Sequence, residues 1–173
     1  MPLLVHLACD GDVAAIARGG IRPGKGRPGI YAMPVMPNFV ASHQWLRELK
    51  RNGGRSLSGV YFRIPDTEAV LFGHYGRTPV PVTAAQATGA ILHAPDPLGM
   101  QIVVPRTVRP GEILRIRRLP QTLGWRYWPK AHGVKPCGCP ACLGRGDIKS
   151  RKLRAEFERG LYSVFQRSGY RFA

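Results

Sequence analysis

Glycine and proline interrupt this chain so often that long regular elements are excluded. The 173 residues include 21 Gly and 16 Pro, and both residue types form turns and end helices or strands. Such a chain favours short strands and helices joined by many turns over a helical bundle. Its 44% hydrophobic residues provide enough apolar side chains for a core, and its length is typical of one domain.

Short apolar runs alternate with helical patterns along most of the chain. The runs predict strands at 3–8, 29–33, 60–64, 69–72, 101–104, 111–116 and 125–128. The 3.6-residue periodicity predicts helices at 13–18, 39–51, 83–93 and 150–167. These elements predict an α+β fold in a single domain, with a core at 1–120 and a Cys-rich basic extension at 121–173 packed on it.

The predicted helices have recognisable N-terminal caps. Asp10 or Asp12 precedes the first helix and Asn38 precedes the second, and both residue types accept hydrogen bonds from free helical amides. Thr83 and Gln86 have the spacing of a capping box before the third helix.

The charge is strongly unbalanced, with 26 Lys+Arg against 10 Asp+Glu and a formal net charge of +16. The excess positive charges repel one another, and a polyanionic partner would offset this repulsion. Nucleic acid is the first candidate for such a partner. The alternative is that the composition reflects genome bias and solubility alone. The residues expected to contact phosphates lie on the predicted helix 39–51 and in the C-terminal region: Arg47, Lys50, Arg51, Arg145, Lys149, Arg151 and Lys152.

No apolar run approaches the length of a membrane span, and the first residues reach His6 and Asp10 too early for a secretory signal. We therefore expect a cytoplasmic protein that has no membrane partner. The sequence leaves the oligomeric state open.

Three of the four cysteines lie close together near the C-terminus. Cys137, Cys139 and Cys142, with His132 before them, lie among Gly and Pro turns that let thiols converge on one ion. This spacing predicts a structural zinc site, with Cys9 or a more distant His as alternatives for the fourth ligand. Free thiols or a redox pair are the other interpretations. A deaminase-type catalytic zinc is not expected, because no Glu stands beside His132.

Three residues on short predicted strands form a second candidate site. His6, Tyr31 and Gln101 each have an ordinary explanation, since a histidine among apolar residues and a tyrosine in a strand are usually core residues. Their order, however, follows a known pattern. Val5-His6-Leu7 precedes a short helix and turn, Gly29-Ile-Tyr31-Ala follows, and Gln101-Ile-Val-Val-Pro105 comes last.

This order resembles that of the ADP-ribosyltransferase-like superfamily, including RNA 2′-phosphotransferases and DarT-like DNA ADP-ribosyltransferases. The resemblance covers roughly residues 3–118 through three short motifs. It implies a split β-sheet core, NAD as the cofactor and a nucleic-acid or phosphorylated substrate. By the same resemblance, His6 would orient the NAD ribose, Tyr31 would stack on nicotinamide, and Arg22 and Arg27 would meet the pyrophosphate.

The third motif departs from the family pattern. Active transferases have a Glu where this chain has Gln101, and the amide keeps the shape and hydrogen bonding but lacks the charge. A weaker enzyme, a relative that only binds, and a chain altered at this position are the three interpretations. The 2′-phosphotransferases work without that Glu and use basic residues instead. The competing hypothesis is a zinc-stabilised nucleic-acid-binding protein without catalysis.

Overall fold

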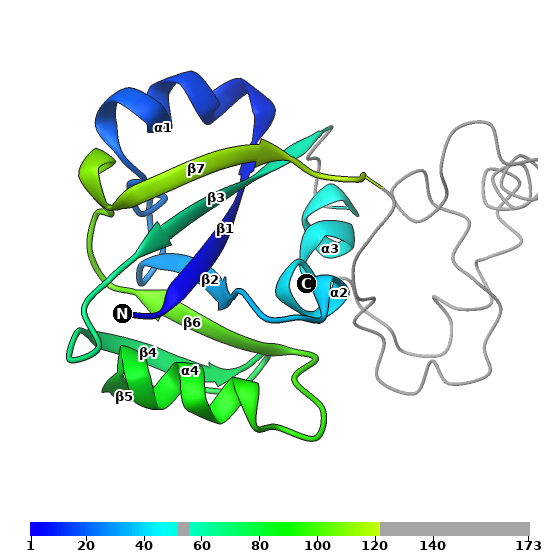
Figure 1. Ribbon diagram of the computed structural model, residues 1–173, viewed down its shortest axis with the longest axis vertical. Helices are drawn as coiled ribbons and strands as arrows, with labels where there is room; N and C mark the ends of the chain where they lie inside the picture. Colours follow the sequence, from blue (N-terminus) through cyan, green and yellow to red (C-terminus); the bar gives the residue numbers. More distant parts are fainter. Residues whose placement is uncertain (52–55, 122–173) are drawn as a thin grey trace, which may run out of the picture.

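The computed structural model describes residues 1–51 and 56–121 (Figure 1). These residues form seven strands: β1 (Leu3–Cys9), β2 (Ile30–Pro34), β3 (Leu57–Arg63), β4 (Ala69–His74), β5 (Val80–Thr83), β6 (Met100–Val104) and β7 (Ile113–Arg118). They also form four short helices: α1 (Val13–Gly19), α2 (Phe39–Ser42), α3 (Leu46–Arg51) and α4 (Ala84–Leu92). The α+β class predicted from the sequence is confirmed. The elements predicted at 125–128 and 150–167 lie outside the described residues.

The seven strands form one open antiparallel sheet in the order β5-β4-β6-β2-β1-β3-β7. Figure 1 shows β7, β3 and β1 on one side of β2, and β6, β4 and β5 on the other. Helix α1 lies near β7, whereas α4 runs beside β4 and β5 (Figure 1). Among the described residues, no helix has the length and apolar character needed to cross a membrane.

The core is formed by apolar side chains of the central strands and of α4. Leu4, Val60, Phe62 and Ile102 are fully buried, and Ile91 joins them from the inner side of α4. Burial of such side chains is the main favourable contribution to folding. In β3, Val60 and Phe62 on one face and Tyr61 on the other are all buried, so this strand is covered on both faces.

Two of the three predicted helix caps are confirmed. The side chain of Asn38 accepts a hydrogen bond from the Ala41 amide at the start of α2. Thr83 and Gln86 form the capping box of α4. Asp12 stands at the N-cap of α1, but its side chain makes no capping hydrogen bond.

The predicted single helix at 39–51 is wrong, because α2 and α3 are separated at His43, Gln44 and Trp45. His43 is buried, and its Nδ1 donates to the carbonyl of Phe39 at 2.8 Å. Its Nε2 therefore accepts the hydroxyl proton of Tyr61, also at 2.8 Å. The partners of these polar side chains lie on the sheet and in a distant loop, so the helical period could not show the break.

Gln44 holds the loop that leads into β6. Its side chain is fully buried, and its Oε1 accepts from the Gly99 amide at 2.6 Å. Its Nε2 donates to the carbonyls of Ala41 and Pro97 at 3.2 and 3.1 Å. These hydrogen bonds fix the start of the strand that carries Gln101.

Gly99 cannot be replaced without strain. Its φ is +84°, and an added Cβ would lie 2.3 Å from Nε2 of His74. Gly99→Ala should therefore lower the free energy of unfolding by about 2–4 kcal/mol, measured by urea denaturation.

Two other glycines serve as controls for this substitution. Gly26 has a φ of +71°, and an added Cβ there would meet no atom within 4 Å. Gly26→Ala should therefore cost only about 1 kcal/mol of backbone strain. Gly89 lies within α4 with nothing near its Cβ position, and Gly89→Ala should stabilise the protein by about 0.5–1 kcal/mol. A Gly99→Ala protein no less stable than Gly26→Ala would contradict this account.

Candidate active site

Strands β1 and β2 separate partway along their length. β1 pairs with β3 along its whole length, from Leu3↔Arg63 to Cys9↔Leu57. With β2 it pairs only at Leu4↔Pro34 and Val5↔Met33. The two halves of the sheet are therefore joined by a short ladder that ends immediately before His6.

The His6 side chain bridges the two strands where they part. Its Nδ1 lies 2.8 Å from the backbone carbonyl oxygen of Tyr31. A carbonyl can only accept, so Nδ1 carries the proton and donates. Burial lowers the pKa of His6, against a smaller opposing effect of this hydrogen bond. The ring is therefore neutral near pH 7, and its Nε2 is a hydrogen-bond acceptor.

Tyr31 and Gln101 lie on the same face of the sheet. Tyr31 pairs with Val103 across β2 and β6, and Gln101 is two residues before Val103, so their side chains share a face. Such diagonal neighbours are about 7–8 Å apart. Both side chains are partly buried. On the other face, Ile30 and Ala32 are buried and hold β2 in place.

The strand position opposite Gln101 has no side chain. Gln101 pairs with Gly73 of β4, so on that side the carboxamide has no neighbouring side chain across the strands. An added Cβ at Gly73 would lie 3.0 Å from Cα of Pro79, which leaves little room for a larger residue. The glycine therefore allows the backbone of Pro79 to approach β4 closely beside Gln101.

The structure brings His6 and Tyr31 into contact and places Tyr31 and Gln101 on one face. By the alternation of β1, His6 belongs to the opposite face from Val5, the residue that pairs with Met33. It reaches the backbone of Tyr31 because the strands have parted. Tyr31 is two residues from Met33, so the side chains of Tyr31 and Gln101 lie on the Val5 face. The His6 side chain belongs to the opposite face and contacts the backbone oxygen of Tyr31.

Of the two arginines expected to meet a pyrophosphate, one lines a surface hollow. Arg22, Arg18 and the Gly19-Gly20 turn border a hollow of about 460 Å³ beside α1. This hollow includes none of His6, Tyr31 and Gln101. Arg27 is exposed, and its amide donates to the carbonyl of Gly24 in a turn at 3.0 Å.

The predicted nucleic-acid contacts that are described lie on α3. Arg47 and Lys50 are partly buried, and Nζ of Lys50 donates to the carbonyl of Gln121 at 3.1 Å. Burial lowers the pKa of Lys50. Arg51 is the last residue of α3. The other four residues of this prediction, Arg145, Lys149, Arg151 and Lys152, lie outside the described residues.

The predicted zinc ligands His132, Cys137, Cys139 and Cys142 also lie outside the described residues, so the zinc site stays a prediction. In the part of the chain that the structure describes, no three His, Cys, Asp or Glu side chains gather as metal ligands would. Cys9, considered as an alternative ligand, is an exposed free thiol at the end of β1.

Sequence reasoning missed the arginines of β7. Arg115, Arg117 and Arg118 are exposed on the strand at one end of the sheet. The sequence predicts a strand at 111–116, which includes Arg115 but ends before Arg117 and Arg118. Its place at the end of the sheet, which leaves the arginines accessible, depends on the order of the strands in space.

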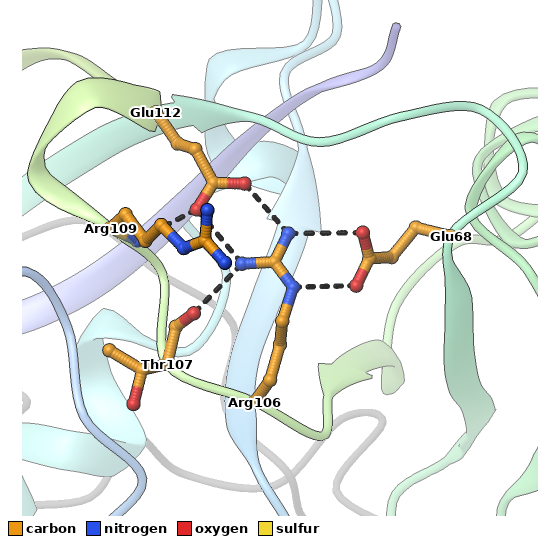
Figure 2. A network of polar contacts seen from close by, with 5 residues as sticks. All are labelled: Glu68, Arg106, Thr107, Arg109 and Glu112. Atoms are coloured by element: carbon orange, nitrogen blue, oxygen red, sulfur yellow. Dashed lines mark hydrogen bonds and ion pairs between the residues drawn. The ribbon is translucent and has the colours of Figure 1, made fainter.

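Beyond β6, Arg106 ties three segments together. All five of its N–H donors are used, on both carboxylate oxygens of Glu68, both of Glu112 and the carbonyl of Thr107, at 2.7–3.0 Å (Figure 2). The Arg109 amide also donates to Glu112 at 2.7 Å (Figure 2). Charge-assisted, bidentate hydrogen bonds are among the stronger polar contacts. The cluster joins the start of β4, the end of β6 and the turn before β7.

This cluster predicts a pH-dependent contribution to stability. The hydrogen bond from Arg106 is the main cause that lowers the pKa of Glu112. Glu112→Gln should lower the free energy of unfolding by about 1–2 kcal/mol at pH 7. The pKa of Glu112 is lower in the folded than in the unfolded protein. The full difference in the free energy of unfolding should therefore be present above the unfolded pKa of about 4.3. It should shrink as the pH falls through the folded pKa.

The measurement is urea denaturation of both proteins at several pH values. Asp66→Asn is the matched control, since Asp66 pairs with the N-terminal amine while 57% of its side chain is exposed. It should change stability by only a few tenths of a kcal/mol. A Glu112→Gln effect that does not change between pH 7 and pH 3 would contradict the electrostatic explanation.

Comparisons with protein-family models, curated proteins and solved structures found no match to this chain.

Proposed function

We propose that this chain binds NAD at the separation of β1 and β2 and transfers ADP-ribose to nucleic acid at a low rate. The observation that carries the proposal is the hydrogen bond from the His6 ring to the Tyr31 carbonyl where the two strands part. It places the first two residues of the three-motif pattern in contact, although they are 25 positions apart. Gln101, the third residue of the pattern, lies on the same face of the sheet as the Tyr31 side chain.

The available groups fit the parts of NAD that they would contact. The acceptor Nε2 of a neutral His6 suits a ribose hydroxyl, which is a donor. The partly buried ring of Tyr31 suits stacking on the nicotinamide ring. Gln101 can both donate to and accept from a ribose hydroxyl. Arg18 and Arg22 would supply positive charge to the pyrophosphate from their hollow.

A low rate follows from the residue at position 101. NAD supplies an activated bond between ribose and nicotinamide, and positive charge develops on the ribose as this bond breaks. A carboxylate next to that charge stabilises the transition state, whereas a carboxamide contributes only its dipole. Gln101 therefore orients the ribose but provides little electrostatic stabilisation.

The test uses NAD labelled in its adenylate phosphate, incubated with the full chain and separate pools of single-stranded DNA, RNA and protein. We expect label to become attached to DNA or RNA and free nicotinamide to appear at the same rate. Label on protein alone would overturn the assignment of nucleic acid as acceptor. A folded chain that attaches no label and releases no nicotinamide would overturn the proposed activity.

The alternative function is nucleic-acid binding without catalysis. The exposed arginines of β7 favour it, because they provide a basic surface that needs no cofactor. The two functions differ in one measurable respect, since only the first predicts that NAD stabilises the folded protein.

A further inference from the structure

Among the described strands, β7 lies at one end of the sheet, and it carries a dense group of exposed arginines. β7 has Arg115, Arg117 and Arg118 within four positions and no acidic residue, and all three are exposed. Arg63, also exposed, belongs to the neighbouring strand β3. We call these four residues the β7 arginine edge. Arg118 lies 3.6 Å from Asp10, but 77% of its side chain remains exposed, so little of its charge is neutralised.

The arginines of β7 lie on both sides of the strand. Arg115 pairs with Tyr61 and Arg117 with Gly59, so their side chains share one face. Arg118 pairs with Ser58 and points to the other face. Residues two apart in a strand are about 6.7 Å apart, which is comparable to the distance between consecutive phosphates of one nucleic-acid strand. A strand passing along the edge could therefore be contacted at successive phosphates.

Arg115 is held in position by buried residues. Its guanidinium carbon lies 4.6 Å from the ring centroid of Tyr61, in a cation–π contact. The Tyr61 hydroxyl is in turn anchored on the buried His43. An arginine already fixed in this way loses less side-chain entropy when it binds a ligand. The stacked guanidinium still has N–H donors at its edge for a phosphate.

Protection of an exposed sheet edge does not by itself explain three arginines. Edge strands are commonly protected from aggregation by charged side chains, lysine above all, or by proline. The opposite end of the same sheet, β5, has Pro81 and no charged residue. One sheet therefore has two edges of very different charge, and the charged edge needs a further reason.

We infer that the β7 arginine edge binds the sugar–phosphate backbone of a nucleic-acid strand. Arginine suits phosphate because its planar group can donate two parallel hydrogen bonds. The net charge of +16 makes an anionic partner favourable over the whole molecule. This inference deepens the proposed function, because it names where its nucleic-acid substrate would bind. Its test is made without NAD.

The test is fluorescence anisotropy of labelled 20-nucleotide single-stranded DNA and RNA with the full chain, from about 50 to 200 mM salt. Arg117→Gln/Arg118→Gln should weaken binding about tenfold or more at the lower salt. Two lost phosphate contacts should also reduce the slope of log K against log salt by about 1.4. Arg117→Lys/Arg118→Lys should restore most of the slope but only part of the affinity, since lysine keeps the charge and loses the bidentate geometry.

Lys25→Gln/Arg77→Gln is the matched control, because it removes the same charge from two exposed loop positions away from β7. It should leave the slope nearly unchanged. Equal losses in the two double variants would show a general charge effect and overturn the inference, and so would no loss in the β7 variant. Poly-glutamate binding as tight as nucleic-acid binding would overturn the choice of partner. Melting temperatures confirm that each variant is folded.

Failure of this inference is distinguishable from failure of the proposed function. If the β7 variant binds nucleic acid normally while the unaltered chain releases nicotinamide, only the assigned surface is wrong. If the β7 variant loses nucleic-acid binding and the unaltered chain does not turn over NAD, the assigned surface is supported and the proposed catalysis is wrong.

Discussion

Gln101→Glu should raise the rate of nicotinamide release from NAD about tenfold or more. The substitution adds a negative charge, at nearly unchanged shape, next to the ribose on which positive charge develops. Electrostatic stabilisation of this kind is commonly worth a few kcal/mol, and 1.36 kcal/mol corresponds to a factor of ten in rate. The measurement is steady-state nicotinamide release with DNA, with RNA and with no acceptor.

Gln86→Glu is the control for this substitution. It makes the same chemical change on the first turn of α4, where glutamate also serves in a capping box, and should leave the rate unchanged. Turnover by a well-folded Gln101→Glu protein that stays at the level of the unaltered chain under all three conditions would count against a transferase site built on Gln101.

His6→Asn should lower nicotinamide release about tenfold or more while leaving the melting temperature nearly unchanged. The asparagine amide can replace Nδ1 as donor to the Tyr31 carbonyl, but it has no group at the position of Nε2. The substitution thus separates the structural role of the ring from its proposed contact with the ribose. His6→Ala removes both and should lower stability as well as turnover.

His43→Asn provides a matched control on the second buried histidine. His43 also donates through Nδ1 to a carbonyl, but its Nε2 accepts from Tyr61 within the core. Its substitution should lower stability and leave turnover per folded molecule unchanged. If His6→Asn behaves in the same way as His43→Asn, or turns over NAD normally, His6 has only a structural role.

Local patterns predicted most of the individual elements in the described residues. Apolar runs located six of the seven strands, and the capping residues located the starts of α2 and α4. β5 was missed because Pro81 interrupts its pattern, and proline is tolerated there only because β5 lies at an edge of the sheet. The edge position is a property of the assembled sheet, so no local pattern contains it.

Long-range contacts explain the other differences. The break between α2 and α3 depends on Tyr61 and on the loop at Pro97, which receive the side chains of His43 and Gln44. The sequence could suggest His6, Tyr31 and Gln101 as a set only through the order of the motifs. Their relative placement depends on where β1 leaves β2, which is decided by pairing between distant strands.

The central claim is that NAD binds at His6, Tyr31 and Gln101, and thermal unfolding with and without NAD tests it most directly. A ligand at 100 times its Kd stabilises the folded state by about 2.7 kcal/mol, which raises the melting temperature by several degrees in a domain of this size. We predict this rise for the unaltered chain and for Gln101→Glu, and its loss in Tyr31→Ala, which cannot stack on nicotinamide. An unaltered chain whose melting temperature does not respond to NAD, or an equal rise in a folded Tyr31→Ala protein, would contradict the account.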